Sequence, residues 1–232
     1  MPTVVYQPGE SPALDTYIRN VSRGTSGFPT DATVKVGPGS VSFSGGHTDQ
    51  RIIFDWDISD LPDGIKVQSA TLDLTKQSAP QTAGLPIAGR IYRLDDPAMT
   101  ESATWATSDG SNAWASPQLP AGGGGGTLDT SRFVAVTISD GNLSVSDTIL
   151  TSMVQDAVNN RNKRFRMVLG VEIDFTDSTP TASAEMAYHS SGAGVVESRP
   201  KLTIQYFRHR GGMLRSATMS RAGRPKNRKV EP

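Results

Sequence analysis

The chain contains no cysteine among its 232 residues, which excludes disulfide bonds, thiol catalysis and zinc sites built from thiolates. Its first residues lack a basic stretch followed by an apolar run, and no segment resembles a bilayer span, so neither a signal peptide nor a membrane contact is predicted. A chain of this length can still bury a sizeable core without cross-links. All-β chains of about 200 to 250 residues commonly form one domain, so we expect one core.

A net charge of zero conceals two segments of opposite sign. Residues 208–232 hold eight Lys and Arg and one acid, which leaves fifteen basic and twenty-two acidic residues in 1–207, so the two parts carry +7 and −7. We therefore predict a body over 1–207 and a basic C-terminal tail over 208–232 that binds an anionic or acidic surface. A solvated terminus without a partner is the alternative. The basic side chains of the tail are Arg208, Arg210, Arg215, Arg221, Arg224, Lys226, Arg228 and Lys229.

Short runs in which apolar and polar residues alternate dominate the body, a period typical of strands with one buried face. In residues 51–58 the side chains of Ile52, Phe54, Trp56 and Ile58 share one face, and those of Arg51, Ile53, Asp55 and Asp57 take the other. This pattern predicts a half-buried central strand. Further strands are predicted over 3–6, 15–19, 33–36, 67–75, 87–94, 133–138, 166–175, 184–189 and 201–207.

About ten strands separated by Gly, Pro, Ser and Asp turns predict an all-β fold, a jelly-roll β-sandwich of antiparallel strands. One helix is expected within residues 146–160, where apolar residues recur at helical spacing. Ser146 can cap its first turn, and Asn159 and Asn160 can end it. We expect this helix to cover one end of the sandwich core.

Residues 95–132 show no clear period and contain Trp105 and Trp114. Long ordered loops are often functional, and these two indoles with Tyr92 could form an aromatic platform for a sugar. The alternative, which we favour, is that both tryptophans pin the segment onto the sandwich, since burial of an aromatic ring offsets the entropy of ordering a loop.

No group of side chains has the spacing of a known metal site. His47, His189 and His209 are scattered along the sequence. Two groups of acidic residues could form an oxygen cage for Ca²⁺, but no calcium-loop pattern accompanies them. No metal or other cofactor is therefore expected. The acidic residues concerned are Asp55, Asp57, Asp60, Asp63, Asp95, Asp96 and Glu101.

Nothing in the sequence selects a catalytic residue. The string Ser198–Lys201 matches a Ser-x-x-Lys pattern but leads through Pro200 into a strand instead of starting a helix. No pair of carboxyl groups stands out for glycoside hydrolysis. The tail has cations for phosphate but no aromatic ring to stack on bases, so nucleic acid is not an expected partner. We expect no enzymatic activity.

Several strings in the body stand out together: Asp15–Ile18, Arg51–Asp55 with Leu61-Pro62, Ser69–Leu74, Tyr92–Leu94, Thr100–Trp105 and Arg199–Ile204. They resemble the DNRLRE domain family, which is related to carbohydrate-binding module family 96, and their order and spacing match across residues 13–207. The family consists of jelly-roll sandwiches on microbial surface proteins and polysaccharide-degrading enzymes, so the resemblance implies adhesion or glycan binding without catalysis. One departure is Met99, where the family pattern has tryptophan.

Here the module stands alone and carries a basic tail, which favours a component of a bacteriophage virion that decorates the capsid or belongs to a tail or fibre. In this interpretation the sandwich faces outward, the tail anchors it to virion proteins or to further copies in a homo-oligomer, and Ile53, Val168 and Phe207 are candidate exposed contacts. The alternatives are that they are ordinary scattered surface hydrophobes or that they are buried beneath the second sheet. The competing function is a carbohydrate-binding module at the cell surface or outside the cell, which recognises a polysaccharide through Trp105, Trp114 and Tyr92.

Overall fold

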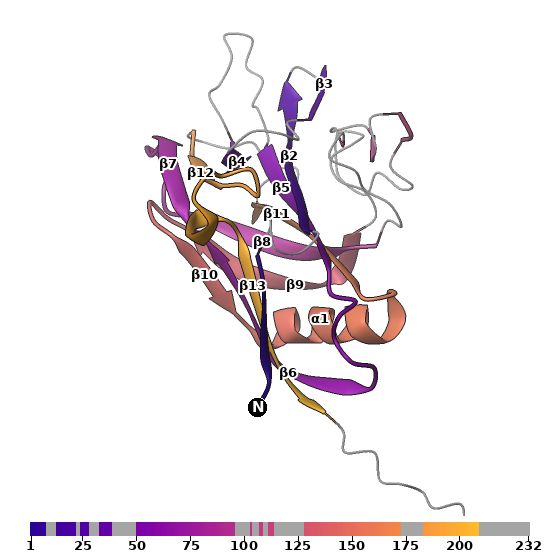
Figure 1. The fold of residues 1–232 in the computed structure, drawn as a ribbon. Helices are drawn as coiled ribbons and strands as arrows, with labels where there is room; N and C mark the ends of the chain where they lie inside the picture. The colour runs from indigo at the N-terminus through magenta and orange to yellow at the C-terminus, as the bar shows by residue number, and fades with distance from the viewer. Residues whose placement is uncertain are drawn as a thin grey trace, which may run out of the picture.

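The computed structural model describes residues 1–7, 13–21, 24–27, 33–38, 50–95, 103, 107–108, 111–113, 128–172 and 183–208. Most of them form antiparallel strands in two facing sheets, a β-sandwich (Figure 1). The four-stranded sheet has the order β1 (Thr3–Tyr6), β13 (Lys201–Arg208), β6 (Ile65–Leu74), β10 (Leu143–Ser146). The six-stranded sheet has the order β3 (Gly24–Gly27), β2 (Ala13–Val21), β5 (Gln50–Asp57), β11 (Arg164–Val171), β8 (Ile87–Leu94), β9 (Leu128–Ile138).

A short third sheet has the order β4 (Thr33–Val36), β12 (Glu185–His189), β7 (Lys76–Gln81). Only Thr75 separates β6 from β7, so one long stretch of chain serves two sheets. The turn before β6, predicted from its Gly and Pro residues, carries the chain from β5 in the six-stranded sheet to β6 in the opposite one. Strands β5 and β6, consecutive in the sequence, thus lie in different layers.

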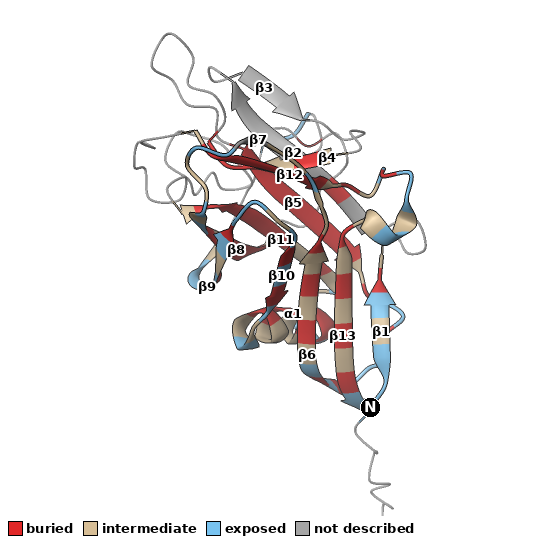
Figure 2. Cartoon of the chain, turned by 90° about the vertical axis from the view of Figure 1, so that its left-hand side faces the viewer, coloured by how far each residue is buried: buried red, intermediate tan, exposed pale blue. Residues whose placement is uncertain are grey.

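The main core lies between the two large sheets and confirms that Ile52, Phe54, Trp56 and Ile58 share an inward face. Leu72 and Ile204 from one sheet and Phe54 from the other are all buried. The ring of Trp56 stacks on Phe54 and on Phe165, with centroid distances of 4.8 and 5.8 Å. Figure 2 shows the resulting alternation of buried and less buried residues along β6 and β13, as expected for strands with one wet face.

Strand β5 differs from the prediction, because both of its faces are buried (Figure 2). Arg51, Ile53 and Asp55 are at most 1% exposed, although alternation had assigned them to the wet side. The reason is a second hydrophobic cluster on the outer face of the six-stranded sheet, which contains Ile53 and Val168. The expectation that these two residues are exposed contacts was therefore wrong, whereas Phe207 is 43% exposed.

One residue of the long segment that follows β8 belongs to the second cluster. Ala103 is fully buried in it together with Tyr92, Leu94 and Leu128. The chain beyond β8 thus returns to cover the outer face of the six-stranded sheet at Ala103. Because the second cluster covers this outer face, β5 and β11 carry apolar or ion-paired side chains on both of their faces.

The predicted helix is confirmed as α1 (Thr148–Asn160), and its apolar side buries Leu150, Met153, Val154, Ala157 and Val158. It packs against β6 of one sheet and against β9 and β11 of the other, so it covers one end of the sandwich core (Figure 1).

The helix cap is one residue later than predicted. The carboxylate of Asp147 accepts a hydrogen bond from the Ile149 N–H at 2.6 Å, whereas Ser146 belongs to β10 and lies opposite Thr71. At the other end, Arg161 is the C-cap, and Asn162 and Lys163 turn the chain with positive φ angles.

The predicted strand over 166–175 is described only to Val171, and Ile173 and Phe175 lie outside the described residues. The predicted boundary between body and tail also falls inside an element. Arg208, assigned to the tail by its charge, is the last residue of β13 and lies opposite Ile65. The remaining tail residues, 209–232, lie outside the described part of the chain.

Candidate functional site

Of the three predicted ligand-binding aromatics, the structure describes Tyr92, whereas Trp105 and Trp114 lie outside the described residues. The Tyr92 ring is 4% exposed and lies against Phe133 at a centroid distance of 5.6 Å. Its hydroxyl accepts a hydrogen bond from Arg90 Nη1 at 3.0 Å. Arg90 also stands 4.2 Å from the Phe133 ring centroid and pairs with Glu172. The Tyr92 ring therefore has little surface to offer a sugar, and its ligand role stays a prediction.

A charge network joins β8, β9 and α1 around Arg93, whose side chain is 9% exposed. Its guanidinium pairs with Asp95 at 2.9 Å, with Asp129 at 3.0 Å and with Asp156 at 2.7 Å. Arg161 adds pairs with Asp95 at 3.0 Å and with Asp156 at 2.9 Å. The network thus fastens the C-terminal half of the helix to the six-stranded sheet.

Two carboxyl groups of this network, those of Asp129 and Asp156, are held ionised. A hydrogen bond from Ser131 and the charges of Arg93 and Arg132 lower the pKa of Asp129 despite its partial burial. Burial alone would raise the pKa of Asp156, but hydrogen bonds from Asn160 and Arg161 and the charge of Arg93 together lower it. These carboxylates therefore stabilise the fold by ion pairing, and none is set up as a proton donor near neutral pH.

Other residues of the family-like strings have structural roles as well. Asp55, 1% exposed, accepts from Arg164 Nη2 at 2.6 Å and from Arg166 Nε at 2.9 Å, which ties β5 to β11. The carboxylate of Asp15 accepts from the Ser191 N–H at 2.7 Å and from the Ser191 hydroxyl, which ties β2 to the turn after β12. The carboxylates of Asp15 and Asp55 therefore hold strands and a turn in position.

The acidic residues considered as an oxygen cage for calcium do not converge within the described residues. Asp55 and Asp57 face Arg164, Asp63 pairs with Lys163 at 2.7 Å, and Asp60 accepts from Tyr6. The part of the chain that the structure describes contains no group of three or more His, Asp or Glu side chains suited to a metal ion. Asp96, Glu101, His47 and His209 lie outside that part, and His189 is the last residue of β12.

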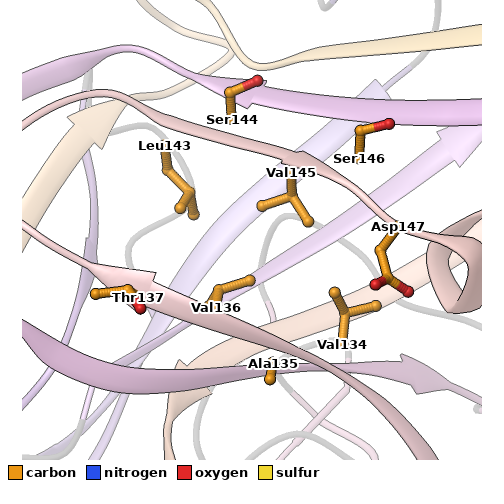
Figure 3. Close-up of a pocket in the computed structure, with 9 residues that line it drawn as sticks. All are labelled: Val134, Ala135, Val136, Thr137, Leu143, Ser144, Val145, Ser146 and Asp147. Carbon is orange, nitrogen blue, oxygen red and sulfur yellow. The ribbon is translucent and has the colours of Figure 1, made fainter.

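The feature that sequence reasoning missed is a groove of about 340 Å³ between β9 and β10 (Figure 3). Leu143 and Val145 of β10 point toward Val134 and Val136 of β9, which form an apolar floor. Ser144 and Ser146 point away from this floor, and Asp147 is the single charged residue that lines the groove. The lining residues are Val134, Ala135, Val136, Thr137, Leu143, Ser144, Val145, Ser146 and Asp147.

The groove lies between two open sheet edges, because β9 and β10 are the outermost strands of their sheets on this side. An outermost strand presents unpaired N–H and C=O groups at alternate positions, which can pair with an added strand. The groove therefore suits an extended peptide segment better than a compact ligand.

No protein-family model matches the chain, and no curated protein matches it. No helix in the described part of the chain has the length and apolar character that crossing a bilayer requires.

Proposed function

We propose that the sandwich is a jelly roll. In a jelly roll of eight strands, the first, eighth, third and sixth strands form one sheet and the second, seventh, fourth and fifth form the other. The orders β4-β12-β7 and β1-β13-β6-β10 fit the first sheet if β1 and β4, β6 and β7, and β12 and β13 each count as one strand. The order β5-β11-β8-β9 fits the second sheet, with β2 and β3 added at its edge.

We propose further that the protein is a non-enzymatic structural component of a bacteriophage virion, as a capsid decoration or a tail or fibre protein. In this proposal the sandwich faces outward and the basic tail anchors it to virion proteins or further copies. The observation that carries the proposal is the charge division, +7 in residues 208–232 against −7 in 1–207. Opposite charges on two parts of one chain favour association between copies or with an acidic neighbour.

The ion pairs that three buried charged side chains form inside the sandwich support a structural role. Arg93, Asp55 and Glu185 are each 8% exposed or less, and each has an oppositely charged partner on a neighbouring element. The burial of Tyr92 also weighs against the competing carbohydrate-binding proposal, which needs an open aromatic face.

The test is whether the protein is part of particles and whether the tail keeps it there. Antibodies against the sandwich should label virions purified from the strain that carries the gene, and the protein should sediment with them. A variant with the seven Lys and Arg of 209–232 replaced by Gln should be lost from particles, whereas Arg132→Gln in the sandwich should be retained. Specific binding on a glycan array that Trp105→Ala and Trp114→Ala abolish would instead establish the carbohydrate-binding alternative.

A further inference from the structure

We propose that the groove between β9 and β10 binds residues 213–220 of the C-terminal tail of a second copy as an added β-strand. This inference rests on the proposed role of the tail as an anchor and gives that anchor a receptor. It depends on three features: the open edges of the groove, the composition of the tail, and the distance between the end of β13 and the groove.

The groove matches an extended segment in length and in chemistry. Its two walls are the four-residue stretches Val134–Thr137 and Leu143–Ser146, the length of a short strand. The floor residues Val134, Leu143 and Val145 are at most 7% exposed, so small or flexible apolar side chains could cover them without disturbing the core. The only charge in the lining is the carboxylate of Asp147. A basic partner strand would be favoured there, and an acidic one disfavoured.

The tail holds one segment suited to this groove. Residues 213–220 form a run free of Gly and Pro that is bounded by Gly211-Gly212 before it and by Gly223 and Pro225 after it. In an extended chain Met213, Ala217 and Met219 share one face with Arg215, because successive side chains alternate. These apolar side chains would face the floor of the groove, and Arg215 could reach Asp147.

The distance from the end of β13 favours a second copy as the source of the segment. On β6, Ser146 lies opposite Thr71 and Arg208 lies opposite Ile65. Six residues of strand correspond to about 20 Å along β6, and the two strand spacings from β13 to β10 add about 10 Å across, a separation of about 22 Å. The chain from Arg208 to Met213 spans at most about 18 Å when fully extended. The chain's own segment therefore falls short of the groove.

The absence of cysteine allows a direct test by disulfide trapping in the full-length chain. One copy carries Thr137→Cys or Ser144→Cys in the groove, and a second copy of different tag size carries Ser216→Cys, whose side chain would lie on the outward face of the extended segment. The control carries Thr3→Cys on β1, an exposed residue at the opposite edge of the four-stranded sheet. After mild oxidation, we expect a disulfide-linked heterodimer from a groove variant and at least about tenfold less from the control.

Two results would overturn the inference while leaving the anchoring role of the tail intact. One is an oligomer that still forms although neither groove cysteine cross-links more than the Thr3→Cys control. The other is a Thr137→Cys/Ser216→Cys double variant that closes only within one chain, which would make the chain's own tail the occupant. Complete absence of tail-dependent assembly would contradict the proposed function as well.

A charge placed in the groove gives an independent measurement. Thr137→Arg adds a cation to the lining of the groove, where it repels a basic segment, and fills part of the groove, so association measured by sedimentation equilibrium should weaken about tenfold. Thr3→Arg at the opposite edge should leave association unchanged. Both positions are exposed, and circular dichroism would verify that the fold is retained. Equal affinities for the two variants would contradict binding in the groove.

Discussion

Replacement of Arg93 by methionine should destabilise the protein by about 2–3 kcal/mol. Arg93→Met keeps an apolar stem but leaves Asp95, Asp129 and Asp156 facing one another with Arg161 as their main remaining cation. Removal of one partner from a buried ion pair costs about 3–5 kcal/mol. The three carboxylates are 26%, 13% and 23% exposed, so solvent screening reduces that cost.

Urea unfolding followed by tryptophan fluorescence measures this cost through the transition midpoint. The melting temperature should fall by about 5–10 °C, because one kcal/mol corresponds to about 2–4 °C in a chain of this size. The matched control is Arg132→Met, whose pair with Asp129 is 3.5 Å long and whose side chain is 48% exposed. We expect this control to stay within about 0.5 kcal/mol of the parent protein.

The pH dependence of the stability loss in Arg93→Met tests whether the charge network causes that loss. The pKa values of Asp129 and Asp156 are lowered from their ordinary value in the folded protein, so their stabilisation is present above the unfolded pKa of about 4 and is lost as pH falls through the folded values. The stability difference between the parent protein and Arg93→Met should therefore shrink below about pH 4. A loss smaller than about 0.5 kcal/mol, or a difference that stays constant into acid, would refute the reasoning.

Two further changes test the core and the backbone. The buried hydroxyl of Tyr188 has no hydrogen-bond partner among the described residues, so Tyr188→Phe should leave stability unchanged or raise it by about 1 kcal/mol in urea unfolding; a clear loss would reveal a partner. Gly37 has a φ of 118° and a Cβ there would lie 1.9 Å from the Ala184 carbonyl oxygen, whereas Gly64, with a φ of 67°, has open space. Gly37→Ala should therefore cost more than about 3 kcal/mol and Gly64→Ala about 1 kcal/mol in thermal melts, and equal costs would contradict the assigned close contact.

The sequence predicted most of the buried strands, because alternation identifies any strand that has one wet face. It failed at β5, where Arg51 and Asp55 look like surface residues but are buried, since a residue pattern does not reveal a second covering layer. Strands β3 and β7 were missed because Gly24–Gly27 has no apolar side chain and Lys76–Gln81 contains Pro80. Their pairing partners, not their own composition, make them strands.

The groove could not be predicted for a related reason. Strand β10 has only four residues, and its two apolar side chains, Leu143 and Val145, are too few to establish a period. That β9 and β10 end up at the same side of the two sheets depends on long-range pairing with β8 and β6. The charge of the tail, by contrast, is a property of composition alone and needed no structure.

The burial of β5 on both faces has a consequence for how the protein unfolds. Ile53 and Phe54 are neighbours in the chain, yet the first belongs to the outer cluster and the second to the main core. On β11, Val168 and Met167 are divided between the two clusters in the same way. Separation of β5 from β11 would disrupt both clusters at once, so we expect the two clusters to unfold in a single cooperative step and the backbone amides of this strand pair to be the last to exchange with deuterium.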